Sequence, residues 1–158
     1  MIIKSLELQD YRNYDSLNLA FDRGTNILYG DNAQGKTNIL EAIYVSATTK
    51  SHKGSKDRDI VNFHKEEAHI RTFLEKEGVE TRVDLHLRKS GSKGIAIDGQ
   101  KIKKAADLLG ICNVVFFSPE DLGIIKEGPA ERRRFVDMEL CQLDGFYLYN
   151  LNHYNKIV

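Results

Sequence analysis

Eight consecutive residues near the start of the chain have the types and spacing needed to hold a chain of phosphates. Residues 30–37 read Gly-Asp-Asn-Ala-Gln-Gly-Lys-Thr and match the pattern G-x-x-x-x-G-K-[ST]. In this pattern the backbone N–H groups surround a β-phosphate, the lysine reaches the β- and γ-phosphate oxygens, and the hydroxyl binds Mg²⁺. We therefore predict a nucleoside triphosphate site in which Lys36 supplies the cation and Thr37 the Mg²⁺ ligand.

The residues around this loop predict a strand before it and a helix after it. The apolar run 26–29 leads into the loop and is expected to be a core strand, and apolar residues recur at spacings of three and four over 39–47. The N-terminus of such a helix points N–H groups and a positive dipole end at the phosphates. A glycine turn that caps an ordinary helix is the disfavoured alternative. The predicted nucleotide-binding residues are Gly30, Asp31, Asn32, Ala33, Gln34, Gly35, Lys36, Thr37 and Asn38.

Composition indicates one ordinary soluble domain, and we expect it to be cytoplasmic. The 158 residues are 41% apolar and 29% charged, with 23 basic and 23 acidic side chains. No apolar run approaches the roughly 20 residues that a membrane helix needs, and the N-terminus lacks the order of a signal peptide. Cys112 and Cys141 are expected to be buried and free. Because the charge is balanced, any DNA contact must come from local patches.

Alternating apolar residues predict an antiparallel sheet in the first two thirds of the chain. Strands are expected near 6–8, 17–21, 68–74 and 83–87, and a tight hairpin at Asp98-Gly99. The polar run 50–58 is expected to be an exposed loop. The fold class predicted is α/β with α+β features: a P-loop domain that carries an antiparallel β subdomain.

The last third changes character. Residues 111–117 are almost continuously apolar and are expected to form a strand buried on both faces. Ser118-Pro119 then predicts the start of a short helix, and Pro129 the start of a longer one. Its apolar stripe runs to Val158, with a possible bend at Asp144-Gly145. Since no helix stop signal precedes Val158, we expect the chain to be cut inside a helix.

Hydrolysis would need an acid that holds Mg²⁺ and orients water at the end of an apolar strand. Glu120 is the one candidate, but Ser118-Pro119 begins a helix between it and the apolar run. Asp121 is expected to be an acid of an early helical turn, which the helix dipole favours. We therefore expect that the second half of the catalytic apparatus lies outside this sequence.

Three basic clusters are candidates for DNA or partner contacts, and a solvated surface is the alternative for each. They are Lys50, Lys53, Lys56 and Arg58; Lys101, Lys103 and Lys104; and Arg132, Arg133 and Arg134. From these we select Lys53, Lys56, Arg132 and Arg133. Consecutive arginines fan around a helix at about 100° per residue, so at most two of the triplet can face one partner.

Six short segments, in this order, resemble the RecF family of bacterial recombination mediators over essentially the whole chain. They are 11–14 (Tyr-Arg-Asn-Tyr), 30–38, 51–53 (Ser-His-Lys), 117–122 (Phe-Ser-Pro-Glu-Asp-Leu), Gly128-Pro129 and 132–137. That family is similar in fold to the two-lobed ABC-type ATPase heads of Rad50 and the SMC proteins. The resemblance implies that 1–117 is ATPase lobe I and that 118–158 begins the helical lobe II, as an N-terminal part.

The resemblance also implies a function. Such a protein is an ATPase that forms an ATP-dependent homodimer and binds double-stranded DNA at gapped junctions. With RecR, and through it RecO, it helps to load RecA during DNA replication, repair of DNA damage and the SOS response. In that family ATP lies between the phosphate loop of one subunit and an LSGGQ-type signature of the other. This sequence contains no such signature, so we expect weak nucleotide binding without hydrolysis from this chain alone.

The resemblance assigns further residues. Arg12 and Asn13 lie between two predicted strands, where related heads bring polar groups to the nucleotide, with a solvated hairpin as the alternative. Glu120 falls where related heads place a residue that links the lobes to Mg²⁺. Two other functions stay open. One is a docking module for RecR with little nucleotide role. The other is an unrelated small P-loop NTPase, which the absence of an Asn-Lys-x-Asp motif disfavours.

Overall fold

The computed structural model describes residues 1–118 and 128–157, which belong to two compact units, 1–108 and 109–158. Each unit is described by itself. The predicted Glu120 and Asp121, and the helix expected to begin at Ser118-Pro119, lie outside the described residues, as does Val158. The division into lobes at residue 117 stays a prediction.

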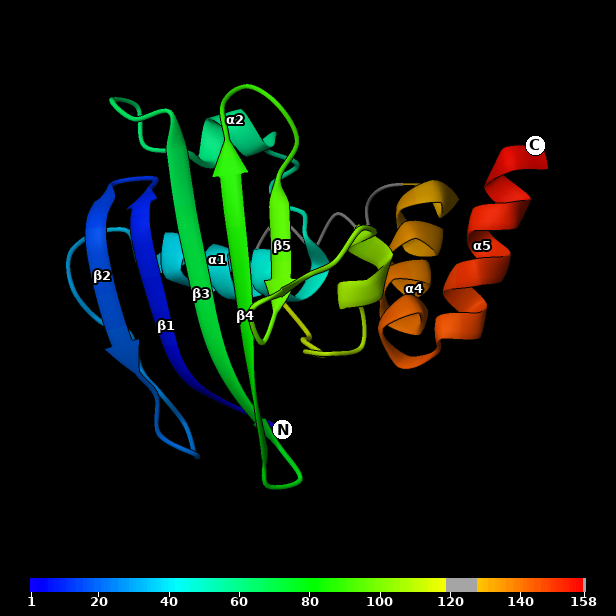
Figure 1. Cartoon of the computed structure of the whole chain (residues 1–158), viewed down its shortest axis with the longest axis horizontal. Coiled ribbons are helices and arrows are strands. Elements are labelled where there is room, and N and C mark those ends of the chain that lie inside the picture. The colour runs from blue at the N-terminus through cyan, green and yellow to red at the C-terminus, as the bar shows by residue number, and fades with distance from the viewer. Residues whose placement is uncertain (119–127, 158) are drawn as a thin grey trace. The chain divides into compact units, whose positions relative to one another are not determined.

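A six-stranded antiparallel sheet forms the frame of the first unit (Figure 1). Its order is β2-β1-β3-β4-β5-β6, so that only β1 and β3 are neighbours without being consecutive. The strands are β1 (Ile2–Tyr11), β2 (Tyr14–Ala20), β3 (Glu67–Lys76), β4 (Val79–Arg88), β5 (Gly94–Ile97) and β6 (Gln100–Lys101). The alternating patterns are thereby confirmed. The hairpin at Asp98-Gly99 is confirmed too, and both residues have positive φ (51° and 81°), as a type I′ turn requires.

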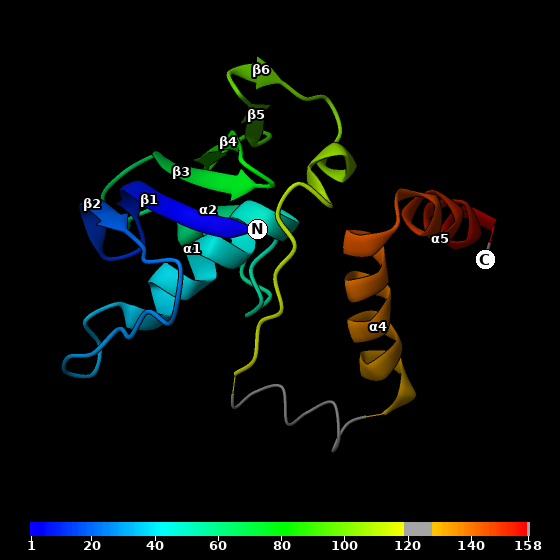
Figure 2. The ribbon, with the colours of Figure 1, turned by 90° about the horizontal axis from the view of Figure 1, so that it is seen from below.

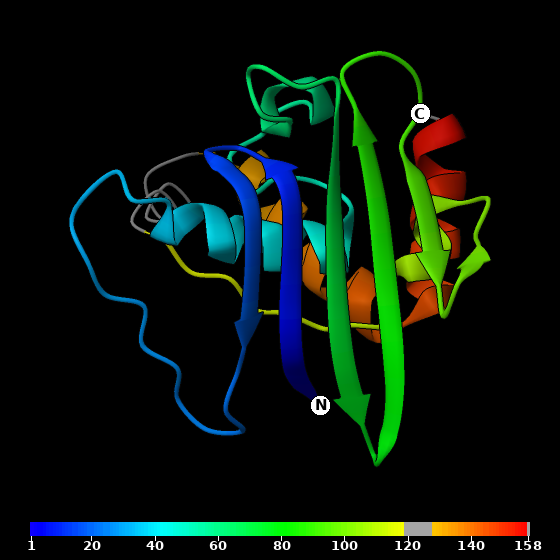
Figure 3. The ribbon, with the colours of Figure 1, turned by 60° about the vertical axis from the view of Figure 1, so that its left-hand side comes forward.

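Helix α1 (Lys36–Thr48) packs on one face of this sheet, as Figures 2 and 3 show from two sides. Its buried residues Ile39, Ala42 and Val45 share the core with apolar side chains of the central strands. Those side chains are Leu6, Leu8, Ala68, Ile70, Leu74, Val83, Leu85 and Leu87. Since alternate strand residues point to opposite faces, the residues between them form a polar outer face. The helix predicted after the loop is confirmed.

Two predicted core strands are wrong. The runs 26–29 and 111–117 contain no strand residues, and Tyr29 and Val115 are 91% and 82% exposed. An apolar run indicates burial, but a strand also needs a neighbour for its N–H and C=O groups. In the described part of the chain the six strands pair with one another and neither run joins them. Asn26 instead closes a turn, in which its side chain accepts from the Asp22 N–H (2.8 Å).

The polar segment 50–58 is only partly the exposed loop that its composition predicts. Ser51 is buried, and the short helix α2 (Asp57–Ile60) begins inside the segment and buries Ile60 in the core. A 3₁₀ helix, η1 (Ala105–Leu108), follows the last strand. Helix patterning misses such short elements because one turn has no periodicity to detect.

The described part of the second unit contains two helices where one apolar stripe was expected. They are α4 (Pro129–Leu143) and α5 (Gly145–Ile157), and the predicted start at Pro129 is confirmed. The possible bend is a full break, because the Asp144 side chain accepts from the Phe146 N–H (2.8 Å) as a cap of α5. Cys112 and Cys141 are buried and free, as predicted. Among the described helices, none has the length and apolar character to cross a bilayer.

Candidate nucleotide-binding site

The phosphate loop ends where α1 begins. Gly35 is the N-cap of this helix in a left-handed conformation (φ 93°, ψ 6°), and it offers no side chain to cap the first turn. The N–H groups of Lys36 and Thr37 have no acceptor inside the helix because they open it. No acidic residue of the first turn offsets the helix dipole. This end of α1 is therefore built to receive an anion.

Lys36 extends back along the loop. Its ammonium group donates to the carbonyl oxygens of Gly30 (2.7 Å) and Asp31 (2.5 Å), so it lies over the loop rather than in solvent. Both acceptors are neutral, and a phosphate oxygen is a stronger, charged acceptor. The ammonium is thus positioned to pass from these carbonyls to a phosphate held at the same loop.

The turn between β1 and β2 braces the loop. Tyr14 donates its hydroxyl to the Gln34 carbonyl (3.1 Å), and the Asn38 amide donates to the Asn13 side chain (2.8 Å). A Cβ added at Gly35 would lie 2.6 Å from the Tyr14 hydroxyl and 2.8 Å from the Asn13 amide. The positive φ of Gly35 and this close approach both explain why glycine stands here. We call residues 12–14 the brace.

The third brace residue, Arg12, reaches a buried glutamate that the sequence reasoning missed. Glu41 is 0% exposed in its side chain, and its two carboxylate oxygens accept from Arg12 Nε (2.9 Å) and Nη2 (2.7 Å). Tyr11 (3.3 Å) and Ser51 (2.5 Å) also donate to it. A signal was available, because Glu41 falls among the apolar positions of the helix, and an acid buried there needs a partner.

The electrostatics of this cluster favour an ionised Glu41. Burial by itself would raise the pKa of Glu41, but hydrogen bonds from Arg12 and Ser51 outweigh burial and hold the pKa below its ordinary value. Burial, followed by the charge of Glu41, raises the pKa of Tyr11 far above neutrality. A carboxylate, a guanidinium and a neutral phenol therefore form one hydrogen-bonded network.

This network changes the expectation for the brace. Arg12 is only 20% exposed and also donates to the Asp59 carbonyl of α2 (2.7 Å) and to Ser55 (2.9 Å), so a solvated hairpin is wrong for it. In the described structure its guanidinium faces Glu41. Direct contact of Arg12 with a nucleotide stays a prediction.

An open groove of about 660 Å³ continues from the brace, and its lining includes Asn13, Asn38, Val61 and Phe63. Phe63 is 86% exposed, and Lys89 Nζ lies 6.0 Å from the centroid of its ring. An exposed aromatic ring beside a cation is suited to stacking a flat heterocycle. The groove thus joins the polar side chains beside the phosphate loop to an aromatic surface.

The basic side chains selected from the sequence belong to two different units. Lys53 and Lys56 belong to the first unit, where the Lys56 N–H bonds Asp59 (3.1 Å) at the start of α2. Arg132 and Arg133 lie exposed on α4 of the second unit. Their neighbour Arg134 approaches Glu131 at 3.9 Å. Thr37 stands in the first turn of α1, as Mg²⁺ ligation requires.

A glycine-rich loop that ends in Lys-Thr at the start of a helix, on a mixed α/β frame, defines a P-loop nucleotide-binding domain. The chain belongs to the AAA domain family, whose model matches residues 5–144.

Among curated relatives, the chain is 66% identical over 156 residues to the DNA replication and repair protein RecF of Agathobacter rectalis. That match covers 99% of this chain and 43% of the relative. It is 48% identical to RecF of Clostridium acetobutylicum over 158 residues, which is 100% of this chain and 44% of the relative. The predicted resemblance to RecF is confirmed, and the chain spans less than half the length of these relatives.

Solved structures agree with this. A structure of the recombination mediator protein RecF with ATP, in the RecFOR pathway, has a TM-score of 0.92 at 36% identity and covers 98% of this chain and 43% of that one. A structure described under ATP-driven dimerization of SMC ATPases has a TM-score of 0.66 at 21% identity. It covers 86% of this chain and 98% of that one, and it shows likeness of fold alone. The predicted fold class is confirmed.

Proposed function

We propose that this chain is the ATP-binding part of a RecF-type protein of DNA replication and repair. The observation that carries the proposal is the loop 30–35 at the uncapped start of α1, with Lys36 held over it and the brace packed against it. The similar RecF structures with ATP and an ATP analogue support ATP as the ligand. Titration of the chain and of its Lys36→Ala variant with ATP and Mg²⁺ tests the proposal.

In this proposal each group of the site has one task. N–H groups of the loop and of the first turn of α1 hold the phosphates, and Lys36 neutralises the β- and γ-oxygens. Thr37 supplies a hydroxyl ligand to Mg²⁺, which would neutralise phosphate charge when bound. The chain alone binds nucleotide weakly and does not hydrolyse it, because its sequence contains no LSGGQ-type signature. The whole protein is proposed to be a cytoplasmic ATPase, active as an ATP-dependent dimer on gapped duplex DNA with RecR and RecO in the response to damage.

The groove predicts where the base of the nucleotide lies. We expect Phe63→Ala to weaken ATP binding by about tenfold, because stacking of a base on an aromatic ring contributes about 1–3 kcal/mol. Calorimetric titration with ATPγS and Mg²⁺ measures this. Inorganic triphosphate has no base, so its affinity should be the same for Phe63→Ala and the unaltered chain.

Val79→Ala is a matched control, since Val79 is also an exposed apolar residue (65%) but lies at the far turn between β3 and β4. Equal losses for ATPγS and triphosphate in Phe63→Ala would place the base elsewhere.

A docking role is the second candidate function, and the helices of the second unit favour it. Large side chains on α4 and α5 are exposed, among them Leu143 (73%), Phe146 (76%) and Tyr154 (62%). Exposed apolar groups gathered on one element are typical of protein interfaces. We expect the chain to retain RecR in a pull-down and Phe146→Ser to retain less, with His153→Ser on α5 as the control. Equal retention by both variants would remove these helices from the interface.

A further inference from the structure

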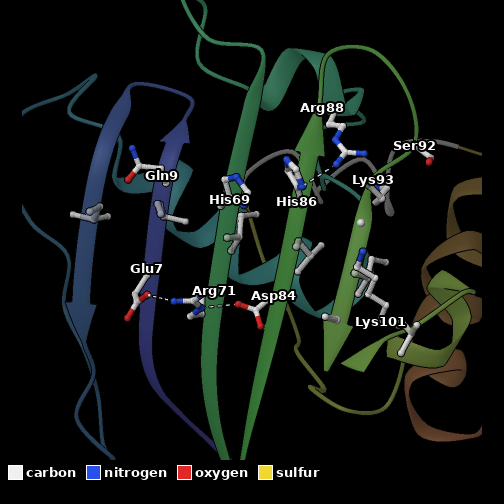
Figure 4. A pocket seen from close by; sticks show the side chains of 18 of the residues that line it. Glu7, Gln9, His69, Arg71, Asp84, His86, Arg88, Ser92, Lys93 and Lys101 are labelled. Carbon is white, nitrogen blue, oxygen red and sulfur yellow. Dashed lines mark hydrogen bonds and ion pairs between the residues drawn. The ribbon is translucent and has the colours of Figure 1, made fainter. Parts of the chain in front are cut away.

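The outer face of the sheet, opposite α1, carries a second group of polar side chains. A pocket of about 590 Å³ lies there, and Figure 4 shows its lining, with His69 and His86 side by side on β3 and β4. Most charges in it are already paired: Arg71 bonds both Glu7 (3.2 Å) and Asp84 (2.6 Å). The pocket is therefore a poor anion site. Its histidines are the side chains in it that can bind a metal ion.

The register of the two strands brings three possible metal ligands together. His69 and His86 are direct cross-strand partners, and Glu67 lies two residues before His69 on the same face of β3. The two rings stack with centroids 4.2 Å apart, and His86 Nε2 lies 2.6 Å from a Glu67 oxygen. One ligand atom from each of the three lies within 4.8 Å of the others.

We propose that Glu67, His69 and His86 bind a divalent cation of the Zn²⁺ class on the outer face of the sheet. Two imidazoles and one carboxylate are a ligand set that Zn²⁺ accepts, with the fourth position left to water. Bonds of about 2.0–2.2 Å at a tetrahedral centre place ligand atoms about 3.3–3.6 Å apart. The most distant ligand atoms must therefore approach by about 1–1.5 Å, and the hydrogen-bonded His86 Nε2 and Glu67 oxygen must separate by up to about 1 Å; side-chain rotation supplies both movements. The backbone need not move, because the ladder of β3 and β4 fixes the three Cα positions.

Arg88 lies directly beside this ligand set. It donates to the second oxygen of Glu67 (3.2 Å) and so orients that carboxylate. Its Nη2 also lies 3.2 Å from His86 Nδ1, a contact that must open when His86 Nε2 binds a metal, because the ring proton then lies on Nδ1 and arginine cannot accept it. The positive charge of Arg88 opposes a cation, so the site should bind less tightly than a closed structural zinc site.

Titration of the whole chain with ZnCl₂ and with CoCl₂, without nucleotide, tests the proposal. We expect one ion per chain, with visible absorption bands for bound Co²⁺. His69→Ala and His86→Ala should each lower the affinity by at least about tenfold, since even residues outside the ligand shell are typically worth 10–100-fold. His153→Ala, an exposed histidine of α5, is the matched control and should bind as the unaltered chain does.

Two further variants make the result decisive. Glu67→Gln keeps the shape of the side chain and should weaken binding while the circular dichroism spectrum stays unchanged, which covers the case of a histidine variant that misfolds. Lys36→Ala should bind Zn²⁺ normally, which separates this ion from one held at the phosphate loop. The proposal would be overturned if His69→Ala, Glu67→Gln and His153→Ala bound Zn²⁺ with the same affinity. It would also be overturned if the unaltered chain did not bind one ion per chain.

Discussion

Lys36→Ala is expected to lower the affinity for ATP and Mg²⁺ by at least about 100-fold. The ammonium group forms charge-assisted bonds to the β- and γ-phosphates in the proposed complex, and such bonds contribute about 1.5–3 kcal/mol each. In the structure this group is held over the loop by the carbonyls of Gly30 and Asp31, so little ordering remains to be done when a phosphate arrives. Calorimetry with ATPγS measures the loss.

Two comparisons distinguish removal of the Lys36 ammonium group from disruption of the phosphate loop. Lys76→Ala removes an exposed lysine at the end of β3 and should leave the affinity unchanged. Thermal unfolding of Lys36→Ala without nucleotide should match that of the unaltered chain, because the loop residues around it are exposed. Unchanged ATP affinity in Lys36→Ala would falsify the assignment of the phosphate loop.

Glu41→Ala is expected to destabilise the fold by about 3–5 kcal/mol. The substitution leaves the Arg12 guanidinium largely buried without its partner, and breaking a buried pair in this way costs that much. Since a typical domain is stable by about 5–15 kcal/mol, this is a large part of the total. Denaturant unfolding followed by circular dichroism gives the change, and ATP affinity should fall with it because the brace loses its anchor on α1.

Exposed ion pairs on the sheet provide the control. Arg71→Ala breaks the pairs of Arg71 (46% exposed) with Asp84 (25%) and with Glu7 (37%), and each loss should cost about 1 kcal/mol or less. The double variant Arg12→Met with Glu41→Met should be less destabilised than the sum of its single variants, because no unpaired charge remains buried. Additive losses would show that the pair is not coupled.

The pH dependence follows from the direction of the shift. The pKa of Glu41 is lower in the folded chain than the ordinary value of about 4.3, since hydrogen bonds from Arg12 and Ser51 outweigh burial. Its contribution to stability is therefore complete above that value and is lost as the pH falls through the lower, folded pKa. The stability difference between the unaltered chain and Glu41→Gln should shrink over that acidic range.

Contiguous signals in the sequence predicted most of the frame. The alternation in β1 to β4, the hairpin at Asp98-Gly99 and the spacing along α1 each depend on residues close in the chain, where local geometry decides. The phosphate loop was found for the same reason, because all eight of its residues are consecutive.

Apart from the one-turn helices and the break at Asp144, the failures involve partners distant in the sequence. An apolar run such as 111–117 indicates burial but does not show whether a neighbouring strand is available to pair with it. Arg12 and Glu41 are 29 positions apart, and the residues around each of them give no sign that the two side chains form a pair. The His69 and His86 pair became visible only through the register of β3 and β4, since a slip by one residue would send one ring to the opposite face.

The position of Arg12 has a consequence for the order of folding. Its guanidinium bonds groups 29, 43 and 47 residues further along the chain, on α1, in the following loop and on α2. Contacts of such separation form only after the entropy of closing long loops has been overcome, which places them late on the folding path. Because the same turn packs against Gly35, the phosphate loop reaches its final shape with these contacts and not with the early hairpins. Competence to bind a nucleotide should therefore return after the β1–β2 and β3–β4 hairpins have formed, together with the other long-range contacts of the first unit.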